Sequence, residues 1–174
     1  VERPEALPDR IRMTFDSSGE SGNDVMSVRG LAKSYPGKAL FDSVSFEVKK
    51  HDRLFICGKN GCGKSTLIKI LAGRISPDKG FASLGYNVKI GYYDQENQDL
   101  HPNNTVIDEL WNAYPTMTET TVRNALALFL FRGDDISKKV SVLSGGEKAR
   151  LTLARLMLSK MNLLILDEPT AVLT

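Results

Sequence analysis

Gly58-Lys59-Asn60-Gly61-Cys62-Gly63-Lys64-Ser65 matches the phosphate-loop pattern G-x-x-x-x-G-K-[ST] at every fixed position. On its N-terminal side, residues 53–57 are mostly apolar and predict a short buried strand. On its C-terminal side, residues 66–72 predict a helix that ends at Gly73. Since the pattern requires a strand, a glycine loop and a helix in this order, the stretch predicts a nucleotide site.

The residue types in this loop suit the binding of a triphosphate. Glycines at positions 58, 61 and 63 allow backbone N–H groups to approach a phosphate. The helix that follows directs its N–H groups and the positive end of its dipole at the same anion. We expect Lys64 to reach the β- and γ-phosphates, Ser65 to bind Mg²⁺ and Thr66 to donate to a neighbouring phosphate. The alternative is a glycine-rich turn that matches by accident, which the flanking elements disfavour.

Two later segments supply further polar groups. In Val142-Leu143-Ser144-Gly145-Gly146-Glu147-Lys148, Ser144 is a good N-cap and the two glycines leave the first N–H groups of a helix uncovered. This segment is either a second anion-binding helix start or a simple capped helix. Residues 163–166 are fully aliphatic, which favours a parallel strand covered on both faces. At its end, Asp167 would hold Mg²⁺ opposite Ser65, and Glu168 would align the attacking water.

The order of elements predicts an α/β fold. Residues 1–24 are interpreted as the end of a linker with one edge strand, in which Ile11, Met13 and Phe15 alternate with polar residues. Alternation over 25–31 and 44–48 predicts an antiparallel β layer, and short strands are expected at 80–84 and 89–93. Helices are expected from Thr105 and over 118–131. Residues 25–174 would thus form one domain, with a mostly parallel phosphate-loop core and a helical subdomain at about 96–158.

Composition narrows the class of protein. The 174 residues are 41% hydrophobic and 25% charged, with a net charge of +2, so charge alone gives no argument for nucleic acid. No apolar run approaches the roughly 20 residues of a membrane span. We expect a cytoplasmic setting with Cys57 and Cys62 as reduced thiols, and His51 and His101 on the surface. Since the chain lacks an initial methionine, we interpret it as a piece of something longer.

With these residues in hand, the chain resembles the ATP-binding cassette (ABC) family. Residues 58–65 match the Walker A loop, residues 163–167 the Walker B strand, and Glu168 the catalytic glutamate. Leu143-Ser144-Gly145-Gly146-Glu147 matches the cassette signature, and Gln95 the glutamine that senses Mg²⁺ and the attacking water. Tyr35 matches the aromatic that stacks on adenine. The resemblance implies ATP and Mg²⁺ as ligands. The residues that would contact the nucleotide are Tyr35, Gly58, Asn60, Gly61, Cys62, Gly63, Lys64, Ser65 and Thr66. The catalytic residues would be Glu168, Gln95 and Lys64. The metal ligands would be Ser65, Gln95 and Asp167.

The resemblance also implies that one cassette is half of a working site. In this family two cassettes pack head to tail, so Ser144, Gly145 and Gly146 would close in trans over ATP held by the partner's Walker A loop. Residues 91–95 and 143–158 look like the F subfamily of soluble twin-cassette proteins, and the lead-in suggests the second cassette. Expected partners are then a second cassette and the ribosome with its rRNA and tRNA, with a role in translation or antibiotic resistance. The alternatives are the motor cassette of a membrane transporter and a non-hydrolysing remnant.

The chain departs from the family pattern in two places. After Thr170, Ala171-Val172-Leu173-Thr174 stands where the family usually has Asn-His-Leu-Asp, which puts the D-loop contact in doubt. The chain also stops before the switch histidine, whose strand in the family lies between the Walker A and Walker B strands. We therefore expect a gap in the sheet with unpaired backbone groups on both sides, and weak or absent turnover by residues 1–174 alone.

Overall fold

The computed structural model describes residues 21–94 and 100–167. Within these ranges the chain forms two compact units. The phosphate-loop unit contains the described residues up to Asp94 together with residues 160–167, and the helical unit contains residues 100–159. The edge strand predicted at Ile11, Met13 and Phe15 lies outside the described residues. Each unit is described by itself below.

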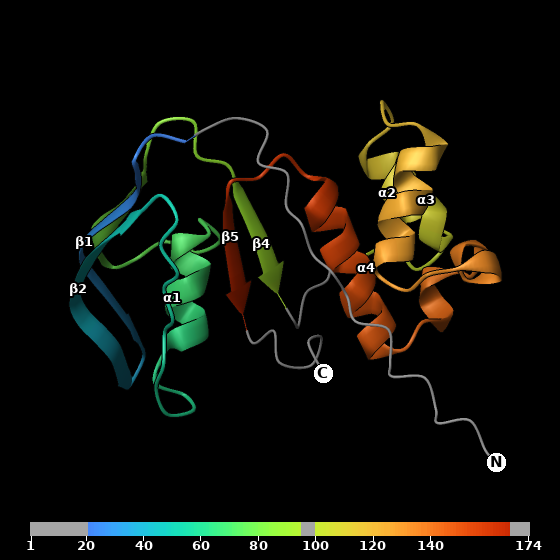
Figure 1. Ribbon diagram of the computed structural model, residues 1–174. Helices are drawn as coiled ribbons and strands as arrows, with labels where there is room; N and C mark the ends of the chain where they lie inside the picture. The colour runs from blue at the N-terminus through green and yellow to red at the C-terminus, as the bar shows by residue number, and fades with distance from the viewer. Residues whose placement is uncertain (1–20, 95–99, 168–174) are drawn as a thin grey trace, which may run out of the picture. The chain divides into compact units, whose positions relative to one another are not determined.

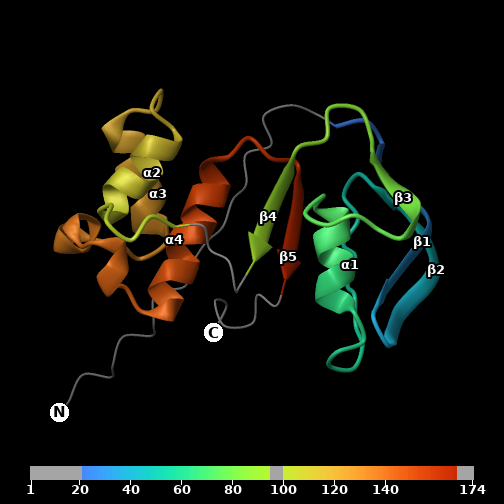
Figure 2. The ribbon, with the colours of Figure 1, turned by 180° about the vertical axis from the view of Figure 1, so that it is seen from behind.

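An antiparallel sheet forms one part of the phosphate-loop unit. Strands β1 (Asp24–Tyr35) and β2 (Lys38–Lys49) make a hairpin, and the turn between them places Gly37 at a φ of 78°. Strand β3 (Lys79–Leu84) pairs with the other edge of β1, which gives the order β2-β1-β3 (Figure 2). The sheet confirms the predicted antiparallel layer.

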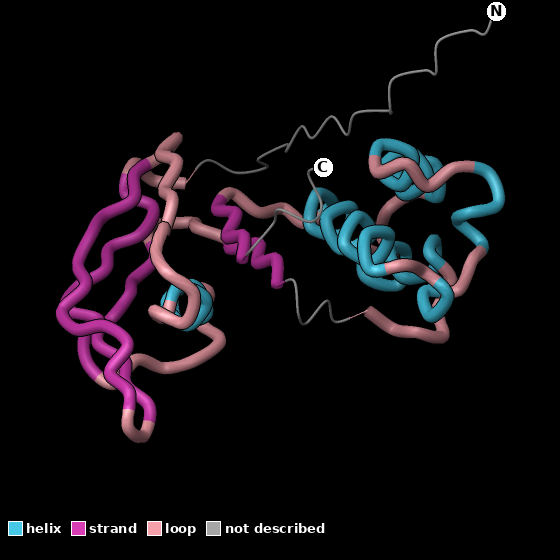
Figure 3. The backbone as a smooth tube through the Cα atoms, turned by 90° about the horizontal axis from the view of Figure 1, so that it is seen from below, coloured by secondary structure: helices cyan, strands magenta, loops and turns pink. Residues whose placement is uncertain are grey.

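A parallel pair of strands and one helix complete this unit. Strands β4 (Ile90–Asp94) and β5 (Leu163–Asp167) pair in register from first residue to last. Helix α1 (Lys64–Leu71) lies between this pair and the antiparallel sheet (Figures 1 and 3). The core joins all three, with each fully buried aliphatic side chain contributing about 1.5–3 kcal/mol. Its buried members are Met26, Val28, Leu31, Leu67, Ile70 and Leu71, and Leu163 and Ile165 of β5 pack against them. The predicted mixed α/β class is confirmed.

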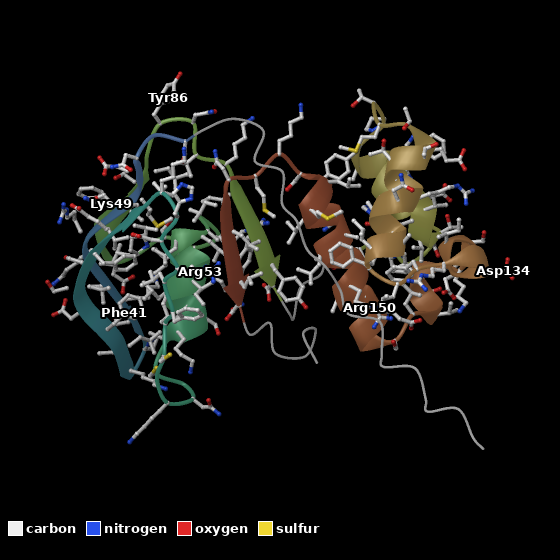
Figure 4. The ribbon with its side chains drawn as sticks, viewed as in Figure 1. Phe41, Lys49, Arg53, Tyr86, Asp134 and Arg150 are labelled. Carbon is white, nitrogen blue, oxygen red and sulfur yellow. The ribbon has the colours of Figure 1, made fainter. Side chains whose placement is uncertain are left out.

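The strand predicted at residues 53–57 is wrong. These residues form no ladder, and the side chains of Leu54 and Phe55 are 52% and 81% exposed. Together with β5 they line a groove of about 610 Å³. Arg53, one of the lining residues, is labelled in Figure 4. A strand forms only where its backbone can hydrogen-bond to a neighbouring strand. Residues 53–57 face the groove in place of such a neighbour, so this apolar run stays irregular. Because the same groove runs along β5, residues 163–166 are only partly buried, and the expectation that both faces of β5 are covered is also wrong.

The helical unit follows its local sequence signals closely. Thr105, Thr118 and Ser144 cap the three helices, and each side chain accepts a hydrogen bond from a backbone N–H in the first turn. In the helix expected over 118–131, an apolar stripe at helical spacing is buried; its members are Val122, Ala125, Leu126 and Phe129. The elements are α2 (Val106–Ala113), α3 (Glu119–Leu128), the 3₁₀ turns η1 (Gly133–Ser137) and η2 (Val140–Val142), and α4 (Gly145–Leu158). In neither unit does a described helix have the length and apolar character needed to cross a membrane.

Candidate nucleotide-binding site

The phosphate loop has the backbone geometry of an anion cradle. Gly61 and Gly63 have φ values of 74° and 101°, in the left-handed region that favours glycine. A Cβ atom on Gly63 would lie 3.0 Å from the Leu40 Cβ, so a larger residue would crowd β2. Gly63 is also the N-cap of α1, and no side chain caps the first N–H groups of this helix. The first turn of α1 thus has N–H groups available for an anion.

Two lysine ammonium groups donate hydrogen bonds to backbone carbonyls of the phosphate loop. The Lys64 ammonium donates to the carbonyl oxygens of Gly58 and Lys59, at 3.0 Å each. The Lys38 ammonium, from the start of β2, donates to the carbonyl oxygen of Gly61 at 2.8 Å. The loop motif predicted that Lys64 reaches the phosphates. It gave no role for Lys38, because no local pattern shows that the β1–β2 hairpin reaches the loop. These positive charges favour binding of a polyphosphate.

The Walker A and Walker B segments meet at Ser65 and Asp167. The Ser65 hydroxyl donates to Asp167 Oδ1 at 3.1 Å, although 102 positions separate the two residues. Asp167 is 6% exposed and ends β5, where α/β proteins place polar ligands. A hydroxyl and a carboxylate at one point are hard oxygen ligands, which suit Mg²⁺. The two residues can hold that ion, and the ion would draw charge from the transferring phosphate and orient it.

A second buried carboxylate, Asp94, stands beside this pair. It ends β4, pairs in register with Asp167 and is 9% exposed. The ammonium of Lys69, one turn after Ser65 on α1, lies 3.8 Å from Asp94 Oδ2. Burial, followed by the charges of Asp94 and Asp167, raises the pKa of Tyr92 well above its usual value, so its phenol stays neutral. Asp94 was not predicted from the sequence, because a polar residue at the end of a strand indicates a site only once its register partner, here Asp167, is known.

Tyr35 lies at the end of β1, in the hairpin that also carries Lys38. Its side chain is 49% exposed, and the Lys33 ammonium lies 5.6 Å from the ring centre. Asp78 accepts from Lys33 at 2.7 Å and from the Ser34 backbone at 2.7 Å. The Lys33 hydrogen bond, assisted by Ser34, lowers the pKa of Asp78 to about 2. An exposed ring on a hairpin held in this way can serve as a stacking face.

The signature residues lie in the helical unit, at the start of α4. The Ser144 hydroxyl donates to Glu147 Oε2 at 2.6 Å, and the Glu147 N–H donates back to Ser144 Oγ at 3.3 Å. This capping box lowers the pKa of Glu147, chiefly through the Ser144 side chain. A Cβ atom on Gly145 or Gly146 would meet nothing within 4 Å, so this helix start is open to an approaching group. Gln95 and Glu168 lie outside the described residues.

Comparison with known proteins places these features in a family. The sequence profile of a family described as ABC transporter matches residues 41–171, which is most of the chain. A solved structure described as the inward-facing conformation of a metal-chelate type ABC transporter is 27% identical. It has a TM-score of 0.67, and the match covers 88% of this chain and 63% of that one.

Three curated relatives are more similar in sequence. YdiF of Bacillus subtilis, an ATP-binding protein by name, is 50% identical, with 90% of this chain and 24% of its own length covered. ABC transporter F family member 5 of Arabidopsis thaliana is 35% identical, with 92% and 24% covered. The energy-dependent translational throttle protein EttA of Escherichia coli O6:H1 is 40% identical, with 86% and 28% covered. This chain therefore spans about a quarter of the length of these relatives.

The phosphate loop, the Ser65–Asp167 contact and the capped signature helix all occur within or beside the segment that the profile matches. This chain is an ATP-binding cassette and belongs to the ABC transporter family.

Proposed function

We propose that this cassette binds ATP with Mg²⁺ and hydrolyses it to ADP and phosphate. The observation that supports this most directly is the 3.1 Å contact between Ser65 and Asp167, next to a loop that carries the ammonium of Lys64. Lys64 exchanges its two backbone carbonyls for phosphate oxygens when the triphosphate binds. The first turn of α1 then faces the same phosphates with its N–H groups.

The remaining roles follow the family resemblance. Glu168 aligns the attacking water, and Gln95 links this water to the metal site. Ser144, Gly145 and Gly146 close over ATP held by a second cassette, so that hydrolysis drives opening and closing of the pair. The open space over the two glycines supports this proposal, since a partner's phosphate can approach the backbone of α4 there.

The preferred biological setting is a cytoplasmic F-subfamily protein that acts on the ribosome, in translation or antibiotic resistance. The support is similarity to an F family member and to a protein named as a translational throttle, at 35% and 40% identity. A transporter cassette is the second candidate, supported by the 27% identical transporter structure. In that setting the chain would act with a separate membrane subunit.

One variant tests both settings in the natural protein that contains this chain. Glu168→Gln should retain ATP binding and accumulate the closed, ATP-bound pair, because the residue that aligns water is lost. Co-sedimentation of this variant with ribosomes in ATP supports the translational role, and capture of a membrane subunit supports the transporter role. Lys64→Ala serves as the matched control, since it should abolish nucleotide binding and both associations. Nucleotide binding that is insensitive to Lys64→Ala would refute the proposed site.

A further inference from the structure

Two contacts of the same kind lie side by side at the ends of β4 and β5. Because an α-helix repeats every 3.6 residues, Ser65 and Lys69 project from the same face of α1, one turn apart. Because Asp94 and Asp167 are register partners on adjacent strands, their side chains leave the sheet on the same face. Ser65 meets Asp167 at 3.1 Å and Lys69 meets Asp94 at 3.8 Å.

Two acidic side chains lie close together in this arrangement. Two carboxylates, 9% and 6% exposed, stand on strands roughly 4.8 Å apart, which is close enough for strong mutual repulsion in a buried setting. Lys69 brings one positive charge, and the Ser65 hydroxyl brings none. A divalent cation held by Ser65 and Asp167 would lessen this repulsion while Lys69 stays on Asp94.

The side chain of Lys69 is long, flexible and 27% exposed. If Asp94 did not attract it, the same ammonium could turn to the neighbouring carboxylate of Asp167. It would then compete with Mg²⁺ for the ligand that the metal needs. A carboxylate at position 94 opposes this competition, because it gives Lys69 an anionic partner on the adjacent strand, 3.8 Å away.

We propose that Asp94 is a positioning residue that holds the Lys69 ammonium away from Asp167 and so keeps the Asp167 carboxylate available to Mg²⁺. The inference rests on the proposed function, since it assumes that Ser65 and Asp167 hold the metal that accompanies ATP. It predicts that the effect of losing Asp94 depends on the presence of Lys69. A residue that only supported the fold, or that bound Mg²⁺ itself, would show no such dependence.

The test measures the affinity for a fluorescent ATP analogue in the natural protein, with Mg²⁺ and with EDTA. Only the binding that Lys64→Ala removes is compared, so that binding at any other nucleotide site is left out. Asp94→Asn should lower the Mg²⁺ enhancement of affinity about ten-fold, because a neighbouring ammonium then occupies Asp167. Lys69→Met alone should leave the enhancement within about two-fold of the wild type or increase it, since it removes only the competing cation. The double variant Asp94→Asn/Lys69→Met should restore the enhancement to within about two-fold of the wild type.

Each result decides between explanations. Glu47→Gln, which removes an exposed carboxylate paired with Arg29 on the antiparallel sheet, is the matched control and should change nothing. The inference is overturned if the double variant is as impaired as Asp94→Asn, or if Asp94→Asn weakens binding equally in EDTA. If the wild type shows no Lys64-dependent binding, the proposed function fails instead. Affinity in EDTA also reports whether each variant retains a folded phosphate loop.

Discussion

Replacement of Glu109 tests how the helical unit is held together. This residue lies on α2 with a side chain that is only 1% exposed. Its carboxylate accepts from the backbone N–H of His101 at 3.2 Å, from Asn104 Nδ2 at 2.8 Å and from Arg155 Nη1 at 3.1 Å. The His101 ring lies 3.1 Å away through Nδ1. One buried carboxylate therefore connects the loop before α2 to the C-terminal half of α4.

We predict that Glu109→Gln lowers the free energy of unfolding of this unit by about 2–3 kcal/mol. Breaking one side of a buried ion pair costs about 3–5 kcal/mol. The Arg155 side chain is 23% exposed, so water replaces part of the lost interaction. The expected cost is therefore about 2–3 kcal/mol, below the range for a fully buried pair. The substitution keeps the volume of the side chain but turns one acceptor into an NH₂ group that faces other donors.

Hydrogen exchange of peptides from α2 and α4, measured in the natural protein, gives the opening free energy of this unit alone. Glu119→Gln is the matched control. It breaks an exposed pair with Arg123 on α3, and about 0.3–0.5 kcal/mol is expected for such a pair. If Glu109→Gln shifts the opening free energy of α2 and α4 by no more than this control does, the assignment of Glu109 as the central tie is wrong.

Three further substitutions can be read by the same exchange measurement. Gly63→Ala should cost about 1–3 kcal/mol in the phosphate-loop unit, because of its positive φ and the approach of Leu40; an unchanged opening energy would contradict the loop geometry. Leu67→Ala removes a core side chain from the buried face of α1 and should cost about 2–4 kcal/mol; a cost below ~1 kcal/mol would mean that α1 packs elsewhere. Ser144→Ala should cost about 1 kcal/mol at neutral pH. Because the folded-state pKa of Glu147 lies below its ordinary 4.5, capping-box stability is complete above that pH and is lost as the pH falls through the lowered pKa. Ser144→Ala should remove most of this acid dependence, and an unaltered pH profile would refute the cause assigned to the shift.

Local signals explain most of what was predicted correctly. The predicted caps Thr105 and Ser144 form because a capping hydroxyl acts on N–H groups two or three residues away. The stripe on α3 is buried because helical periodicity places its members on one face. Gly61 and Gly63 of the phosphate loop adopt positive φ values where the motif requires a tight turn. All of these are interactions within one or two turns of the chain.

The errors concern interactions between distant segments. Residues 53–57 have a strand composition but no ladder, since a strand exists only with a partner. Glu109 follows a helix start, where an acid is favourable without any tertiary partner, whereas Asn104 and Arg155 make it a buried centre of hydrogen bonds. Lys38 reaches the phosphate loop only because the hairpin folds over it.

The order of residues by itself determined the phosphate loop, the capped helices and the family, because these depend on chemistry at fixed short spacings. The motifs led us to expect Asp167 opposite Ser65 at one metal ion. Only the tertiary structure gave the 3.1 Å contact between the two side chains and placed Asp94 and Lys69 next to it. The physical reason is strand register: which side chains become neighbours across a sheet depends on how separate segments pair, and no spacing along the chain encodes that pairing.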